Sequence, residues 1–148
     1  MDIKEKLTDA MRQAMKANDD VTRRTTRMVL AAIKLAEVDK QSAIDDAAVM
    51  SLVQKEIKNR REAIEEARKA NRSDLIADNE AEIKVLEAYL PKAMSPDELR
   101  SVIQAAIEEA GASGPTDMGK VMKLVLPRLG GRAAGDQVSA MVKEMLTK

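Results

Sequence analysis

The sequence contains no cysteine and no histidine among its 148 residues, and Tyr89 is its only aromatic residue. Without cysteine, neither a disulfide framework nor a thiolate metal site is available. Without histidine, the chain lacks the commonest general base and the commonest metal ligand of proteins. The core must therefore be built from Leu, Ile, Val, Met and Ala, a composition typical of a helix bundle. We expect no bound metal and no cofactor.

Net charge and long apolar runs are also lacking. The 25 basic residues balance 25 acidic ones, so any contact with nucleic acid must come from a local excess of positive charge. No apolar run is long enough to span a membrane, and from the charged start of the sequence we expect no signal peptide. These absences predict a soluble, cytoplasmic protein without a membrane partner.

Methionine, in contrast, is abundant, with ten residues. A flexible thioether fills irregular gaps between packed helices, so the methionines are expected mainly in the core. The alternative is a methionine-rich, adaptable binding surface.

Apolar residues with helical spacing predict four helices in the first part of the chain. The expected ranges are 2–17, 21–38, 45–70 and about 73–88, and either Ser73 or Asp74 is expected to cap the fourth helix. Met15 and Met28 fall on the apolar sides and are expected to face inward. These helices are predicted to form an N-terminal unit over residues 1–92, arranged as two helical hairpins.

Two of these predicted helices carry unusual charge. The second bears Arg23, Arg24 and Arg27, which form either a solvated face or a secondary basic face that contacts phosphates. The second half of the third helix is densely charged, with Glu and Arg at helical spacing. Such a helix is either bathed in solvent or docked on a partner along one narrow seam.

Residues 95–148 are predicted to form a small C-terminal unit of three short helices. Ser95, Pro96 and Glu98 form the pattern of a capping box at the start of the first helix, and Gly111 is expected to end it. Pro127 is expected to limit the second helix, because proline cannot donate to the preceding turn. The apolar stripes of these three helices are expected to bury one another; they comprise Leu99, Val102, Ile103, Ala106, Ile107, Ala110, Met118, Val121, Met122, Val125, Val138, Met141, Val142, Met145 and Leu146.

No catalytic motif stands out. Residues 114–121 match a phosphate-binding loop up to Lys120, but Val121 replaces the Ser or Thr whose hydroxyl binds magnesium, and no strand is predicted before it. The serines have no histidine partner, and the paired acidic residues lie where a solvated helix surface would place them. We therefore expect no catalytic residue and no enzymatic activity of the chain by itself.

A local excess of positive charge does occur near the C-terminus. From residue 114 to 148 there are six basic and three acidic residues. The candidate RNA-binding residues are Lys120, Lys123, Arg128, Arg132 and Lys143. A merely soluble surface explains such residues equally well. Because single-stranded RNA is usually bound by aromatic stacking, the one-tyrosine composition favours recognition of a folded RNA by its backbone and shape.

Several ordered strings resemble one protein family. The strings DMGKVM and GGRAAGDQVSAMVKEML resemble the C-terminal domain that YqeY-like proteins share with the tail of the GatB subunit of tRNA-dependent amidotransferases. The strings RTTRMVLAAIKLAEVD, LVQKEIKNRREAIEEARKANRSDL and EIKVLEAYLPKAMSPDEL resemble the N-terminal helical half of YqeY-like proteins. The resemblance therefore extends over nearly the whole chain.

The resemblance implies an all-α fold, with an N-terminal bundle of helical hairpins and a three-helix domain of the GatB-tail type. It also implies a non-catalytic accessory protein that contacts tRNA, because the related tail contacts the outer body of tRNA. The family is linked to glutamine-dependent carbon–nitrogen ligase activity, which we expect to belong to the larger enzyme with the shared tail. The alternative is a protein–protein adaptor that docks through the charged third helix.

Overall fold

Seven α-helices and one short 3-10 helix make up the part of the chain, residues 1–147, that the computed structural model describes, and this part contains no strand. The predicted all-α fold class is therefore confirmed. Two compact units, Met1–Leu90 and Pro91–Lys148, divide the chain. The first contains α1 (Ile3–Ala17), α2 (Asp20–Lys40), α3 (Asp46–Lys69) and α4 (Ser73–Glu87). The second contains α5 (Pro96–Ala110), η1 (Pro115–Asp117), α6 (Met118–Leu129) and α7 (Gly135–Thr147).

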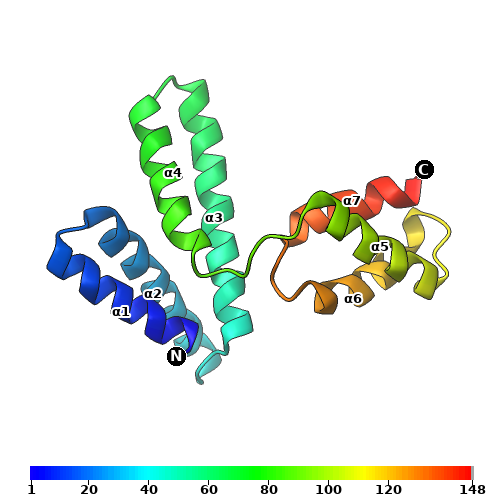
Figure 1. Cartoon of the computed structure of the whole chain (residues 1–148), viewed down its shortest axis with the longest axis horizontal. Coiled ribbons are helices and arrows are strands. Elements are labelled where there is room, and N and C mark those ends of the chain that lie inside the picture. The colour runs from blue at the N-terminus through cyan, green and yellow to red at the C-terminus, as the bar shows by residue number, and fades with distance from the viewer. Residues whose placement is uncertain (148) are drawn as a thin grey trace. The chain divides into compact units, whose positions relative to one another are not determined.

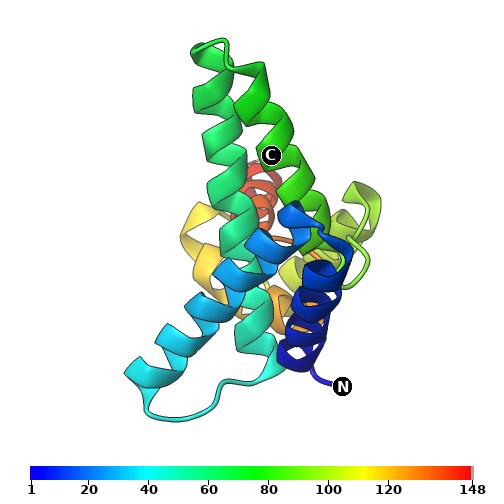
Figure 2. The ribbon, with the colours of Figure 1, turned by 90° about the vertical axis from the view of Figure 1, so that its left-hand side faces the viewer.

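The first unit consists of two helical hairpins, α1–α2 and α3–α4 (Figure 1). Side chains of Asp2, Asp19 and Asp45 accept backbone N–H groups at the starts of α1, α2 and α3, which satisfies donors that have no partner within the helix. The α1–α2 hairpin packs across one end of the α3–α4 hairpin, and the far end of α3–α4 extends beyond it (Figure 2).

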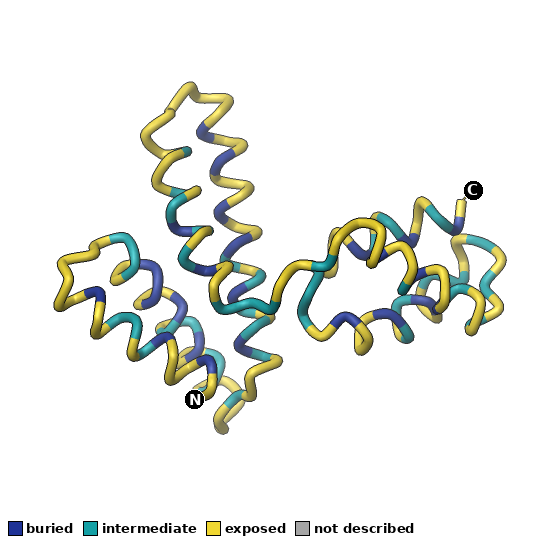
Figure 3. Tube along the Cα trace, viewed as in Figure 1, coloured by how far each residue is buried: buried dark blue, intermediate teal, exposed yellow. Residues whose placement is uncertain are grey.

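The core of the first unit lies where the two hairpins cross. Side chains from α1, α2, α3 and α4 all contribute to it, so the four helices share one apolar centre. Its buried members are Ile3, Leu7, Val29, Ile33, Val49, Val53, Ile57 and Leu86. Along the extending part of α3, buried residues continue on one side only (Figure 3).

The second unit has a core of its own, formed between α5, α6 and α7. The buried members are Leu99, Ile103, Ala106, Val121, Val125, Leu129, Val138, Val142 and Leu146. The predicted capping box is confirmed, because the Ser95 hydroxyl accepts from the Glu98 N–H while the Glu98 carboxylate accepts from the Ser95 N–H. Gly111 ends α5 in the left-handed conformation, as predicted (φ 63°).

One predicted helix end and one predicted helix cap are wrong. Pro127 does not limit α6, which continues through it to Leu129; the proline lies in the last turn, so the hydrogen bond that it cannot donate is lost where only two helical residues follow. Neither Ser73 nor Asp74 caps α4. Its N-cap is Arg72, whose guanidinium binds both carboxylate oxygens of Asp74 at 3.1 and 3.0 Å and so occupies the side chain expected to cap the helix.

The methionines lie around the cores and not within them. None belongs to the fully buried residues, and six of them pack against the edges of the two clusters. Met15 and Met28, both predicted to face inward, are instead exposed. Their positions on α1 and α2 belong to a surface that neither hairpin covers.

Candidate nucleic-acid interface

The packing of α6 decides which of its basic side chains reach solvent. Val121, Val125 and Leu129 are buried against α5 and α7. Lys120 and Lys123, three residues apart, lie on the outer side of the same helix and are exposed. Lys120 lies 4.0 Å from Asp117, the outer limit for an ion pair, and 72% of its side chain is exposed. No acidic partner contacts Lys123 within residues 1–147.

Arg128 and Arg132 behave differently, because each forms an ion pair with an acidic residue of α5. Arg128 binds Glu109 near the C-terminal end of α5. Arg132, in the turn after α6, lies 3.2 Å from Glu98 at the N-terminal end of α5. The two arginines therefore connect α6 and its following turn to both ends of α5.

Arg132 also forms hydrogen bonds with backbone groups of the segment before α5. Its guanidinium Nε donates to the Lys92 carbonyl oxygen at 3.0 Å, and its own carbonyl accepts from the Met94 N–H at 2.9 Å. These bonds join the α6–α7 turn to the segment that leads into α5. The Ser95 N–H and, next, the positive charges of Arg132 and Lys92 hold the pKa of Glu98 below its ordinary value.

Lys143 lies on α7 and is exposed, and no ion pair involves it in the described residues. Of the five candidate residues, the structure thus places Lys120 and Lys123 together on one helix surface. Arg128 and Arg132 are engaged with α5, and Lys143 belongs to a third helix. The sixth basic residue of this region, Lys148, lies outside the described residues.

The secondary basic face lies on the N-terminal half of α2. Arg23 forms an ion pair with Asp20 at 3.0 Å, and Arg24 forms one with Glu82 of α4 at 3.3 Å. Arg27 is exposed and contacts no acidic side chain within residues 1–147. Two open hollows border these arginines; their lining residues are Asp20, Arg23, Arg24, Arg27 and Met28 for the first, and Met11, Met15, Arg23 and Arg27 for the second.

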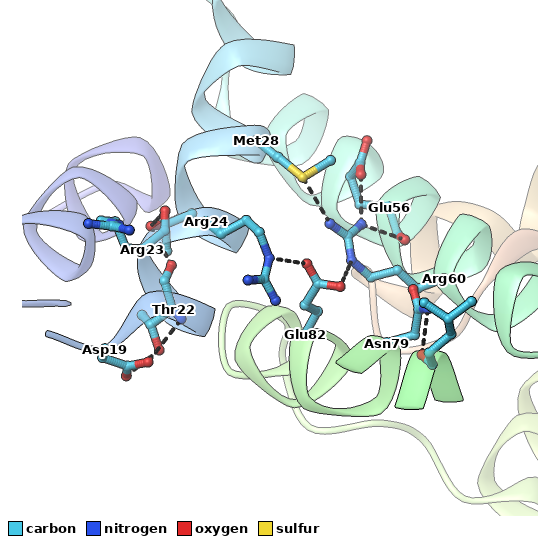
Figure 4. Close-up of polar contacts among 11 residues, drawn as sticks. Asp19, Thr22, Arg23, Arg24, Met28, Glu56, Arg60, Asn79 and Glu82 are labelled. Carbon is cyan, nitrogen blue, oxygen red and sulfur yellow. Dashed lines mark hydrogen bonds and ion pairs between the residues drawn. The ribbon is translucent and has the colours of Figure 1, made fainter. Parts of the chain in front are cut away.

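Behind this face, a partly buried ionic network joins α2, α3 and α4 (Figure 4). Arg60 of α3 has a side chain only 7% exposed, and it lies 2.7 Å from the Glu56 carboxylate and 3.8 Å from that of Glu82. Glu82 in turn receives the Nε–H of Arg24, and an Arg60 N–H donates to the Met28 sulfur at 3.6 Å. The network fixes the N-terminal half of α2 against the second hairpin.

Sequence reasoning missed this network. The sequence predicted that the charged half of α3 is either bathed in solvent or docked on a partner, but Arg60 occupies the helical spacing of Val53, Ile57, Ile64 and Ala67 and is buried within the first unit. A charged residue within an otherwise apolar stripe was the available signal, because burial of a charge requires a partner.

The described residues were also compared with what a membrane span, a metal site and a phosphate-binding loop require. No described helix is both long and apolar enough to cross a bilayer. No group of three or more acidic side chains within residues 1–147 is arranged to hold a metal ion. The loop that resembles a phosphate-binding motif begins a helix directly, without a preceding strand in the described chain, and Val121 is fully buried.

A family model described as "Yqey-like protein" matches residues 4–146. The chain is also similar to two fungal proteins named "Altered inheritance of mitochondria protein 41, mitochondrial". The relative from Pyrenophora tritici-repentis is 30% identical over 139 residues, which cover 92% of this chain and 76% of the relative. The relative from Lachancea thermotolerans is 35% identical over 109 residues, which cover 72% of this chain and only 58% of the relative.

These names contradict the prediction of a cytoplasmic protein, because the relatives are named as mitochondrial. The prediction rested on the charged start of the sequence and on the lack of a long apolar run in it. Neither feature distinguishes the cytoplasm from the interior of an organelle, so the inference was physically unsupported.

Proposed function

The chain belongs to the YqeY-like family, and from this membership we propose that it is a non-catalytic accessory protein that contacts tRNA through residues 91–148. In this proposal it is associated with glutamine-dependent tRNA amidotransfer, and the ligase chemistry resides in the larger enzyme. The proposal extends what the resemblance to the GatB tail implies.

The observation that carries the proposal is the pair of exposed lysines on the outer side of α6. Lys123 contacts no acid among the described residues, and Lys120 is barely within ion-pair distance of Asp117. Lysines in this state can bind RNA phosphates without first breaking a strong internal interaction. Neutralisation of phosphates releases counterions, which is the main source of affinity in sequence-independent binding.

The remaining candidates receive different roles. Arg128 and Arg132 stabilise the position of the helix that carries Lys120 and Lys123, because they hold α6 and its following turn against α5. Lys143 is free to add a phosphate contact from α7. No aromatic side chain occurs in residues 91–148, which favours contact with the backbone of a folded RNA over base stacking.

The alternative is an adaptor that docks through the charged half of α3. Within the α3–α4 hairpin those charges already have partners: Arg68 lies 2.6 Å from Glu65, Lys69 lies 3.5 Å from Glu66, and Arg61 lies 3.9 Å from Glu87. A partner would have to compete with these pairs. We therefore favour the tRNA proposal over docking at α3.

A tRNA titration over a range of salt concentrations tests the proposal. For the double variant Lys120→Gln/Lys123→Gln, the slope of log affinity against log salt should fall by about 1 per lysine. The matched control is Lys55→Gln/Lys58→Gln, which removes two exposed lysines of the same spacing from α3 and should leave the slope unchanged. Circular dichroism should show equal helicity in all three proteins.

Absence of tRNA binding by the parent protein at low salt would refute the proposal. An equal loss of slope in both double variants would also count against it, because the contact would then depend on overall charge and not on α6.

A further inference from the structure

The outward side of α2 carries an apolar stripe that no described residue covers. Met28, Leu35 and Val38 are 48%, 64% and 62% exposed. Ala31, which is also exposed, lies between Met28 and Leu35 along the stripe. Their spacings of three, four and three residues align them along one side of the helix over about 15 Å. This is the spacing with which one helix packs along another.

The stripe is not part of the unit's own core. The residues of α2 that face the core are Thr25, Val29 and Ile33, which are fully buried on the opposite side of the helix. A helix with one side in water needs only one apolar stripe, and α2 has two. A contiguous exposed apolar surface typically marks a site of interaction.

One edge of the stripe is basic. Arg23, Arg27 and Lys34 follow at spacings of four and seven residues, so they form a row beside the apolar side chains. Arg27 and Lys34 contact no acidic side chain within residues 1–147, and only Arg23 is paired, with Asp20. Arg27 and Lys34 therefore present positive charge that no acidic side chain in the described part of the first unit contacts.

The N-terminal end of this surface is hollowed. Two hollows of about 360 and 490 Å³ share Arg23 and Arg27 as walls, and Met11, Met15 and Met28 line them. Methionine side chains adapt to irregular apolar partners, and arginine is enriched at protein interfaces. Behind the hollows, the Arg60 network holds Arg24 and Met28 in place (Figure 4).

We propose that this surface of α2 is a docking site for an amphipathic α-helix of a partner protein, with apolar residues on one side and acidic residues along the adjoining edge. Its apolar side packs on the stripe of Met28, Ala31, Leu35 and Val38. Its carboxylates face Arg23, Arg27 and Lys34. This site is separate from the tRNA surface and does not depend on it.

Charge and polarity favour this occupant over two others. An RNA backbone offers phosphates to the arginines but nothing apolar to cover Leu35 and Val38. A second copy of the chain, paired antiparallel so that Met28 faces Val38 and Ala31 faces Leu35, would set Lys34 of one copy beside Lys34 of the other, and like charges at this separation repel. An acidic amphipathic helix satisfies both the stripe and the basic row.

The test uses the full chain and a synthetic labelled peptide of three heptads, with Leu at the two seam positions and Glu at the flanking positions. A second peptide has Lys in place of each Glu. By fluorescence anisotropy, the Glu peptide should bind at least about tenfold more tightly than the Lys peptide. Leu35→Gln/Val38→Gln should weaken binding of the Glu peptide by about tenfold or more, because two apolar contacts are lost.

Two variants make the result specific. Leu75→Gln/Leu126→Gln removes two exposed leucines elsewhere in the chain and should change the affinity by less than about twofold. Arg27→Glu/Lys34→Glu should reverse the preference, so that the Lys peptide binds more tightly than the Glu peptide. Both positions are exposed, and the variants should keep the parent's helicity.

The proposal is overturned if the Glu peptide binds no better than the Lys peptide, or if the charge reversal leaves the preference unchanged. It is also overturned if sedimentation shows a dimer of the parent protein that Leu35→Gln/Val38→Gln dissolves, because the stripe would then join two copies. Loss of tRNA binding in Lys120→Gln/Lys123→Gln has no bearing on these outcomes.

Discussion

Arg60 and Glu82 are the two buried charged residues of the described chain, and each depends on other charges for its place in the structure. Glu56 and Glu82 lie on two sides of the Arg60 guanidinium, at 2.7 and 3.8 Å. Glu82 also receives Arg24 from α2. Burial of a charge is tolerated only when its partners replace the lost water, so removal of one member should leave another uncompensated.

Arg60→Met keeps the unbranched stem of the side chain and removes the charged guanidinium group. We expect the free energy of unfolding to fall by about 2 to 3 kcal/mol, because Glu56 and Glu82 lose their shared guanidinium in a poorly hydrated site. Urea unfolding followed by circular dichroism measures this change. The control is Arg61→Met: its exposed side chain lies 3.9 Å from Glu87, and the loss should stay below about 0.5 kcal/mol.

A double variant separates charge from packing. Arg60→Met/Glu82→Leu also removes the more buried of the two carboxylates that lose Arg60, so at least about 1 kcal/mol should return. If the double variant is less stable than Arg60→Met alone, the carboxylate of Glu82 is not the source of the loss and the account of the network is wrong.

At this scale, sequence patterns predicted the apolar residues better than the charged ones. Val53, Ile57 and Ile64 recur at helical spacing in the sequence and are buried along one side of α3, because helical spacing alone determines their common side. The partners of Arg128 and Arg132 were not predictable in the same way, since Glu109 and Glu98 are 19 and 34 residues distant in the sequence. Such pairs depend on how helices pack, which local spacing does not encode.

At the scale of single helices, short-range chemistry was the most reliable guide. The capping box of Ser95 and the glycine end of α5 involve residues at most four positions apart, and both were predicted correctly. The failures at Asp74 and Pro127 have local causes too. Arg72 competes for the Asp74 carboxylate, and a proline in the last helical turn costs too little to end the helix.

Gly111 offers a direct test of the α5 ending. Its φ of 63° lies in the left-handed region, which disfavours any side chain, so Gly111→Ala should lower the unfolding free energy of the second unit by about 1 kcal/mol. Gly135→Ala is the matched control at the start of α7. Its φ is not positive and a Cβ atom there meets no neighbour within 4 Å, so stability should be unchanged or slightly increased.

Thermal and urea unfolding of the two variants measure the difference. Equal stability of Gly111→Ala and Gly135→Ala would show that the left-handed conformation at position 111 carries no cost. The ending of α5 would then have to be attributed to the Ala112 N–H, which donates to the Ile107 carbonyl.

For the whole molecule, the important feature is that each unit has its own apolar cluster. No residue belongs to both clusters, and the division falls between Leu90 and Pro91. The two proposed surfaces follow this division, since the α6 lysines belong to the second unit and the α2 stripe to the first. A protein built in this way can bind two different partners through separately folded parts.

Leu99→Ala tests that division. Leu99 is fully buried in the second cluster, and its truncation should cost about 3 kcal/mol through lost burial and a residual cavity. In native-state hydrogen exchange, protection of the slowest amides in α5, α6 and α7 should fall by about a hundredfold, in proportion to that cost. Amides of α1 to α4 should keep their rates, because Leu99 belongs to the cluster of the second unit and not to that of the first. If the first unit loses protection to the same extent, the two clusters unfold as one cooperative body. The α2 and α6 surfaces would then be linked through stability, and a ligand on one would raise the apparent affinity of the other only as far as it increases the folded fraction of the protein.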